Sequence, residues 1–230
     1  MHDAPLHLYE EVLLLALRDD RGTVHFGASA EHAIAGALLA ELLLSGRLTL
    51  DGEAKAAKAI VADTQPLGDA LLDECLARVA GDAKVRKASH WAQHFAGIKR
   101  LKHRAAEGLV HAGVLRVEHD RVLLLFERTR YPGGDQRPEY AVIRRIKRAI
   151  HGSGRDIEPH TLALIALAHH TGLLKHVIEK RLLSENKKRI QQMIAGELAG
   201  QATQQALASM QAAIAVAAII PAVTSAAHSG

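Results

Sequence analysis

Residues 98–126 read IKRLKHRAAEGLVHAGVLRVEHDRVLLLF, and the choice between two possible folds depends on how this stretch is interpreted. Apolar side chains recur at helical spacing from Ile98 to Leu109, and Gly113 is typical of a residue that ends a helix. Two β-prone runs then flank the turn-forming Glu118–Arg121. This order suits the recognition helix and wing of a DNA reader. It suits equally well a helical domain whose basic helix lines a pocket for another phosphate.

The composition favours helices. Apolar residues make up 48% of the 230 residues but aromatic residues only 3%, so the core must consist of Leu, Ala, Ile and Val. The formal net charge is +4, which is too small for a protein coated in nucleic acid, so local basic clusters matter more than the total. Cys75 is the single cysteine, which excludes an internal disulfide, and its flanks predict a buried thiol on an amphipathic helix.

Periodicity and glycine stops predict the elements of the chain. Helices are expected over 6–18, 30–45, 67–80, 89–95, 98–112, 139–151, 158–171, 173–198 and 203–220. Strand pairs are expected over 47–50 with 59–62 and over 114–117 with 122–126. The breaker-rich tract at 127–138 predicts an exposed arm. We therefore expect a mainly α fold, a helical bundle with short β-hairpins of which one is a protruding arm, and a single domain over 1–230.

The two ends of the chain give no membrane-spanning signal. The N-terminal residues lack a basic region followed by an apolar stretch, so no signal peptide is predicted. The apolar run Ala212–Val223 is shorter than the about 20 residues that a spanning helix needs, and it contains Pro221. We expect a buried terminal helix there, and a cytoplasmic protein that is soluble or at most peripheral to a membrane.

Two helices carry a strongly basic face. A helical wheel places Lys99, Lys102 and His103 on one arc of the first, opposite its apolar stripe. The second helix is similar. Its cations are Arg144, Arg145, Lys147 and Arg148. A run of charge is most often a solvated face, but two such helices in one small domain favour contact of at least one with an anion.

No catalytic or metal-binding constellation is present in the sequence. His90 and His94 are spaced for two ligands of one metal, but no third ligand is evident. Glycine-rich phosphate loops, nucleophile elbows and paired-carboxylate motifs are absent, and Glu10 with Glu11 is interpreted as a polar helix face. We therefore expect no enzyme activity, no metal and no cofactor.

Four segments taken in order resemble the Golgi phosphoprotein 3 family. They are LHLYEEVLLLALRDDRGTVHF, GALLAELLLSGRLTL, PLGDALLDECLARV and TLALIALAHHTGLL, and the resemblance covers about residues 6–220. It implies a mostly helical fold with a protruding hairpin implicated in self-association, here the 127–138 arm. It also implies a peripheral membrane protein that recognises phosphatidylinositol 4-phosphate. The Ala-, Leu- and Arg-rich composition and the absence of a long N-terminal arm favour a bacterial member.

The resemblance also implies a headgroup site. Two family arginines fall on Lys99 and Lys102, which keep the positive charge but lack the planar fork that grips phosphate. A family tryptophan falls on or beside Gly27, and a family arginine falls on Ala35. Two of the four expected groups are therefore missing.

The sequence thus predicts a non-enzymatic peripheral protein that binds a phosphoinositide or another anionic phospholipid headgroup. The predicted site consists of Lys99 and Lys102, supported by His103, Arg144, Arg145 and Arg148. One alternative is a winged-helix-like DNA-binding protein, which is disfavoured because the wing 118–121 carries two acids. The other is a protein-binding adaptor, which is compatible with lipid binding.

Overall fold

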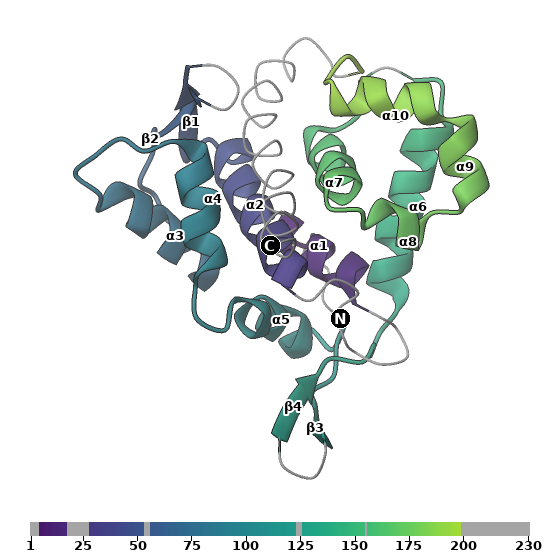
Figure 1. Cartoon of the computed structure of the whole chain (residues 1–230), viewed down its shortest axis with the longest axis horizontal. Coiled ribbons are helices and arrows are strands. Elements are labelled where there is room, and N and C mark those ends of the chain that lie inside the picture. The colour runs from purple at the N-terminus through teal and green to yellow at the C-terminus, as the bar shows by residue number, and fades with distance from the viewer. Residues whose placement is uncertain (1–4, 18–27, 53–55, 123–125, 155, 199–230) are drawn as a thin grey trace, which may run out of the picture.

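The structure is a computed structural model, and it describes residues 5–17, 28–52, 56–122, 126–154 and 156–198. Within these ranges the chain forms ten helices and two two-stranded antiparallel sheets, which confirms the mainly α prediction (Figure 1). The helices are α1 (Leu8–Ala16), α2 (Ala28–Leu44), α3 (Ala70–Ala80), α4 (Ala88–Ala96), α5 (Leu101–His111), α6 (Arg137–His151), α7 (Pro159–His170), α8 (Leu174–Val177), α9 (Lys180–Glu185) and α10 (Lys187–Ile194). The strands are β1 (Leu48–Asp51), β2 (Lys58–Val61), β3 (Glu118–Val122) and β4 (Phe126–Arg130).

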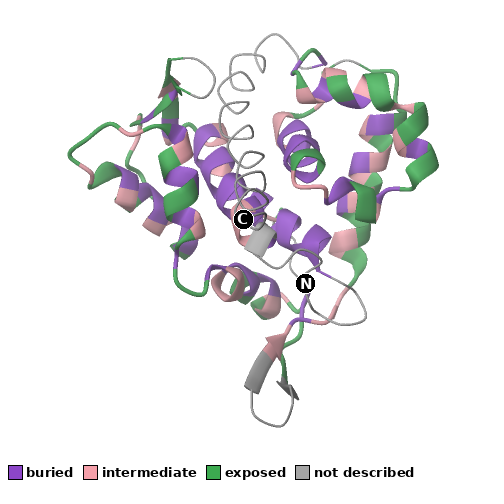
Figure 2. Ribbon diagram, in the orientation of Figure 1, coloured by how far each residue is buried: buried purple, intermediate pink, exposed green. Residues whose placement is uncertain are grey.

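Helices α1 and α2 form the centre of the molecule. All nine residues of α1 are buried, and α1 contacts α2, α5, α6 and α7. Figure 1 shows α3, α4 and the β1–β2 sheet on one side of this pair and α6 to α10 on the other, with α5 at the lower edge. Figure 2 shows that buried residues face this centre while exposed residues lie on the outer helices. A helix surrounded on every side can carry apolar residues all round, as α1 does.

One continuous cluster of buried apolar side chains extends from Leu8 to Leu198. It consists mainly of Leu, Ala, Ile and Val, as the composition predicts. Cys75 belongs to this cluster and is fully buried, which confirms the prediction of a structural thiol. The assignment of 1–230 to a single domain stays a prediction, since the expected terminal helix at 203–220 lies outside the described residues. None of the helices in the described ranges has the length and apolar character needed to cross a bilayer.

The first hairpin confirms its predicted pairing, and the second corrects it. In the first, Leu48 pairs with Val61 and Asp51 with Lys58. In the second, Glu118 pairs with Arg130, so the predicted turn at 118–121 is part of a strand. The β3–β4 hairpin projects from the body (Figure 1) and is the protruding arm, at 118–130 rather than at 127–138. The prediction of self-association through the arm stays a prediction.

The base of the arm is fixed to the end of α5. Gly134 N donates to Val114 O at 2.8 Å and Asp135 N donates to Gly113 O at 3.0 Å. A Cβ atom at Gly134 would lie 2.5 Å from Gly113 O, so only glycine permits this approach of the two backbones. The contact fixes the start of α6 beside the end of α5.

Two helix predictions need correction. The basic helix starts at Leu101 rather than at 98, because Arg100 adopts a left-handed conformation with φ 57°. The helix predicted over 173–198 is divided into α8, α9 and α10. The first break falls at Ile178, whose backbone is extended, and the second at Asn186, which lies outside helical geometry. Ile178 is buried, so the extended backbone turns an apolar side chain into the core.

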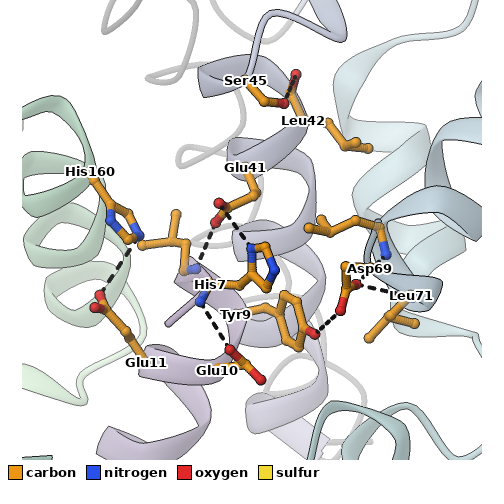
Figure 3. Close-up of polar contacts among 12 residues, drawn as sticks. His7, Tyr9, Glu10, Glu11, Glu41, Leu42, Ser45, Asp69, Leu71 and His160 are labelled. Carbon is orange, nitrogen blue, oxygen red and sulfur yellow. Dashed lines mark hydrogen bonds and ion pairs between the residues drawn. The ribbon is translucent and has the colours of Figure 1, made fainter. Parts of the chain in front are cut away.

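The start of α1 is tied to α2 and α3 by polar contacts (Figure 3). Glu41 accepts from Leu8 N at 2.6 Å and contacts His7 Nδ1 at 3.4 Å. The Tyr9 hydroxyl donates to Asp69 at 2.8 Å. These contacts satisfy polar groups that would otherwise be buried at the centre of an apolar helix pair.

Candidate functional site

The first candidate site is the α5 start, which we define as Lys99, Arg100, Lys102 and His103. Lys99 lies in the turn before the helix, Arg100 is the N-cap residue, and Lys102 and His103 are in the first helical turn. Lys99 and Arg100 are exposed. No side chain caps the helix, and the backbone amides of Lys102 and His103 have no acceptor within the described residues. The first turn therefore presents free N–H donors among three cations.

The cations of this region differ in their acidic neighbours. Arg104, on the same helix, contacts Glu74 of α3 at 2.5 Å, and Glu74 also accepts two hydrogen bonds from Arg78. These arginines hold the pKa of Glu74 below its usual value. Neither Lys99 nor Lys102 pairs with any acid in the described part of the chain. Their charge is therefore available to an external anion.

His103 joins the α5 start to the base of the arm. Its Nδ1 lies 2.7 Å from the hydroxyl of Tyr131, a buried residue that directly follows β4. Partial burial, together with the charges of Lys102 and Arg100, lowers the pKa of His103. The imidazole is thus neutral at pH 7 and contributes a hydrogen-bonding ring rather than a charge.

The second candidate site is a cavity of about 780 Å³ between α1, α6 and α7, which we call the α6 cavity. It reaches the end of α5 at Ala112 and Val114. Its apolar walls include Leu6, Ala141 and Val142. The charged residues of its lining are Glu11, Asp135, Arg137, Arg145, Arg148 and Glu158, together with His160.

A buried ion pair forms the inner wall of the α6 cavity. Glu11 has a side chain only 3% exposed, and Arg145 Nη2 donates to its Oε2 at 2.5 Å. His160 Nε2 lies 3.8 Å from the same oxygen (Figure 3), which is too long for a hydrogen bond. Burial raises the pKa of Glu11, and the hydrogen bond from Arg145 opposes this. Arg145 Nε and His160 Nε2 are buried without a hydrogen-bond partner.

The structure divides the predicted site residues between two places. Lys99, Lys102 and His103 lie together at the α5 start, whereas Arg145 and Arg148 line the α6 cavity at the other end of α5. Ten residues of helix separate Lys102 from Ala112, a rise of about 15 Å. Arg144 is exposed on α6 and does not line the cavity. Of the two family positions that lack their usual group, Ala35 is fully buried in α2 and Gly27 lies outside the described residues.

Sequence reasoning identified only Arg145 and Arg148 among the charged residues of the lining and missed the rest, including Glu11 and His160 of the inner wall. The interpretation of Glu10 and Glu11 as a polar helix face is wrong, because both are buried. A usable signal was present: apolar residues surround these glutamates on every side of the helix, so the acids had to be buried and paired. Glu10 accepts from His7 N at 3.0 Å, and a Cβ at Gly108 of α5 would lie 2.5 Å from its Oε1.

Reactive groups are not gathered at either site. Burial raises the pKa of the Cys75 thiol to about 12, so the thiol remains protonated and unreactive at neutral pH. Among the described residues, no three side chains of His, Cys, Asp or Glu come together as a metal site would require. What both sites offer is hydrogen-bond donors and positive charge.

The sequence of the chain matches a known family model over most of its length. The model is that of Golgi phosphoprotein 3 (GPP34), and it matches residues 8–210. The chain belongs to the Golgi phosphoprotein 3 family. The family in general is one of peripheral, phosphatidylinositol 4-phosphate-binding proteins associated with the Golgi.

A relative from this family extends the comparison. The chain is 29% identical over 205 residues to vacuolar protein sorting-associated protein 74 of Eremothecium gossypii. The match covers 75% of this chain and 61% of the relative. This chain therefore spans about three fifths of the length of that protein.

Proposed function

We propose that this member of the Golgi phosphoprotein 3 family is a non-enzymatic peripheral membrane protein that binds an anionic lipid headgroup at the α5 start. The ligand would be a phosphoinositide similar to phosphatidylinositol 4-phosphate, or another anionic phospholipid. Lys99 and Lys102 would attract the phosphate, and His103 would offer a neutral hydrogen-bonding ring.

The observation that carries this proposal is the electrostatics of the first turn of α5. A helix N-terminus bears partial positive charge, so each cation placed there costs about 0.3–1 kcal/mol rather than stabilising the helix. Three cations surround this N-terminus, and no side chain caps it. A bound phosphate would stabilise this N-terminus in two ways, because it accepts hydrogen bonds from the free N–H groups and neutralises the cations.

The expected affinity is moderate. Each Lys or Arg near an anionic bilayer contributes about 1 kcal/mol, so useful recruitment needs several cations acting together. Lysine ammonium groups act as point charges, which favours attraction to anionic membranes over selection of one phosphoinositide. The exposed Arg144 would add only a long-range contribution, since it lies on a different helix.

The test is sedimentation with liposomes that contain phosphatidylcholine alone, phosphatidylserine, or phosphatidylinositol 4-phosphate. We expect the wild-type chain to bind both anionic compositions, and Lys99→Glu with Lys102→Glu to abolish binding. The matched control is Lys187→Glu with Lys188→Glu, which makes the same charge change at two exposed lysines of α10. Unchanged binding by the first pair, or equal losses in both pairs, would refute the site.

Binding of random duplex DNA at low salt separates this function from the DNA-reading alternative. In the described part of the arm, Arg130 of β4 lies 3.1 Å from the carboxylate of Glu118 on β3, which reduces the charge that this arginine offers to a DNA backbone. We expect no retardation of the duplex in a gel. Strong retardation that the Lys99→Glu, Lys102→Glu variant loses would favour DNA over lipid.

A further inference from the structure

The α6 cavity has the size and wall chemistry of a ligand site that is separate from the α5 start. Its volume of about 780 Å³ lies in the range that small-molecule sites occupy. Such sites combine apolar walls with a few converging polar groups, which is the composition of this lining. The α5 start contributes no residue to it.

The apolar and charged parts of the lining follow one another along α6. Pro138, Ala141 and Val142 lie on its first two turns, and Val114, which follows α5, lines the same cavity. Arg145 and Arg148 lie one and two turns further on. Ala141 and Arg148 are seven residues apart, a rise of about 10 Å along the same helix face. Beyond the paired Asp135 and Arg137 at the start of α6, a ligand lying along the helix would meet an apolar surface first and the cations Arg145 and Arg148 next.

The charges of the lining favour an anion over a cation. The acids Glu11 and Asp135 are already paired, with Arg145 and Arg137 respectively. Arg148 is exposed and its guanidinium has no partner within the described residues, so it is free to bind a ligand. Among the described residues, Glu158 is the one acid of the lining without a cationic partner. It occupies the N-cap position of α7.

The buried pair also orients the second cation. The carboxylate of Glu11 fixes Arg145 through Nη2, while Nε of the same guanidinium is left without an acceptor. The first turn of α7, which contributes His160 to the wall, adds the partial positive charge of a helix N-terminus. Arg145, Arg148 and the start of α7 therefore all border the cavity with positive potential, which Glu158 at the start of α7 partly offsets.

We infer that the α6 cavity binds a small amphipathic anion, a carboxylate or phosphate monoester on an apolar chain. The anionic end contacts Arg148 beside Arg145, and the apolar chain lies along Ala141, Val142 and Leu6. Glu158 stands close to the anionic end and weakens binding by repulsion. This site is independent of the headgroup site proposed for the α5 start.

The test is isothermal titration of the full chain with decanoate, decyl phosphate and decyltrimethylammonium below their micelle concentrations. We expect both anions to bind and the cation not to bind. The affinities for decanoate and decyl phosphate then show whether the site prefers a carboxylate or a phosphate. Absence of binding by both anions overturns the inference. Equal binding of the cation also overturns it, because that result would mean non-specific apolar contact.

Three variants locate the site. Arg148→Gln should weaken anion binding about tenfold, the loss expected for one charge-assisted contact. Ala141→Trp should abolish binding by filling the cavity, and it should leave folding intact because Ala141 is exposed. Glu158→Gln should strengthen binding about twofold to threefold by removing a like charge. A thermal melt of each variant confirms that it is folded.

The matched control is Arg144→Gln, which removes the same charge from the same helix outside the cavity. Its affinity for decanoate should stay within about twofold of wild type, since a solvent-exposed charge is screened. Equal losses for Arg144→Gln and Arg148→Gln would contradict the assignment. The Lys99→Glu, Lys102→Glu variant should still bind decanoate, so failure of the headgroup site and failure of the cavity site give different results.

Discussion

The lysines of the α5 start and Arg145 of the α6 cavity lie in opposite electrostatic surroundings. Lys99 and Lys102 have no acidic partner in the described part of the chain, whereas Arg145 contacts a carboxylate that is 3% exposed. A helical wheel gives both basic helices the same appearance. The two basic helices differ in their acidic neighbours because α1, which is distant from α6 in the sequence, places Glu11 beside Arg145 of α6. An unpaired cation is available to an outside ligand, while a paired and buried one is first of all part of the fold.

The largest expected effect distinguishes the two regions by stability. Arg145→Leu leaves the buried carboxylate of Glu11 unpaired and should lower the free energy of unfolding by on the order of 3 kcal/mol. Lys99→Glu with Lys102→Glu should not lower it and should raise it by about 0.5–2 kcal/mol, because acids replace cations at a helix N-terminus. Urea unfolding monitored by circular dichroism measures both.

A double variant serves as the control for this prediction. Glu11→Leu combined with Arg145→Leu removes both charges and should recover most of the loss, because apolar residues can replace a buried ion pair. If Arg145→Leu were as mild as the lysine pair, the ion pair would not stabilise the fold, and the contrast between the two regions would disappear.

The next prediction tests whether the α5 start recognises a phosphate group or only negative charge. Lys99→Arg with Lys102→Arg supplies two planar guanidinium groups that can bind phosphate through paired hydrogen bonds. We expect about tenfold tighter binding to vesicles with phosphatidylinositol 4-phosphate, and less than about twofold change with phosphatidylserine at equal surface charge. Flotation of vesicles at matched ionic strength measures the ratio. An equal gain on both lipids would mean that the site senses charge alone.

Sequence periodicity correctly predicted which face of the basic helix is buried. The apolar stripe of the basic segment was correctly predicted: Leu101, Ala105 and Leu109 of α5 and Ile98 just before it are all buried. Glycine positions also located helix ends, since Gly46 and Gly113 take left-handed conformations directly after α2 and α5. Helix faces and helix ends can be predicted from the sequence because each depends on residues that lie close together in the chain.

What periodicity could not give depends on contacts between distant segments. The hairpin register was mispredicted because β3 begins with the exposed residues Glu118 and His119, which carry no apolar alternation and were taken as the turn. Lys99 was expected on the helix, but the left-handed Arg100 places it in the preceding turn. The α6 cavity could not be anticipated, because its walls come from α1, α5, α6 and α7.

A smaller effect converts a paired cation into a free one. Glu74→Gln releases Arg104 and should cost about 0.5–1 kcal/mol, the range of partly exposed ion pairs. Because the folded-state pKa of Glu74 is lowered, its stabilising contribution is present above its unfolded pKa and is lost as pH falls through the folded value. The stability difference from wild type should therefore vanish at acidic pH.

The same substitution tests the surface electrostatics of α5. Freed Arg104 adds one available cation near the α5 start, so binding to anionic vesicles should increase by up to about fivefold. Binding that is unchanged or weaker would mean that Arg104 does not reach the bilayer. Arg78→Gln is the comparison, because it removes a different partner of Glu74 and leaves the Arg104 pair in place.

The smallest expected effect concerns His103. Partial burial and the neighbouring cations lower its pKa, so the ring is neutral at pH 7 and gains a proton only at more acidic pH than an ordinary histidine. A protonated His103 would add a fourth charge to those of Lys99, Arg100 and Lys102. Binding to phosphatidylserine vesicles should therefore rise by less than about threefold as the pH falls below the range in which an ordinary histidine titrates. His103→Gln should remove this part of the rise, while glutamine can still hydrogen-bond to the Tyr131 hydroxyl. If the variant kept the full pH response, the charge would come from other histidines, and His103 would act only by holding the arm against the α5 start.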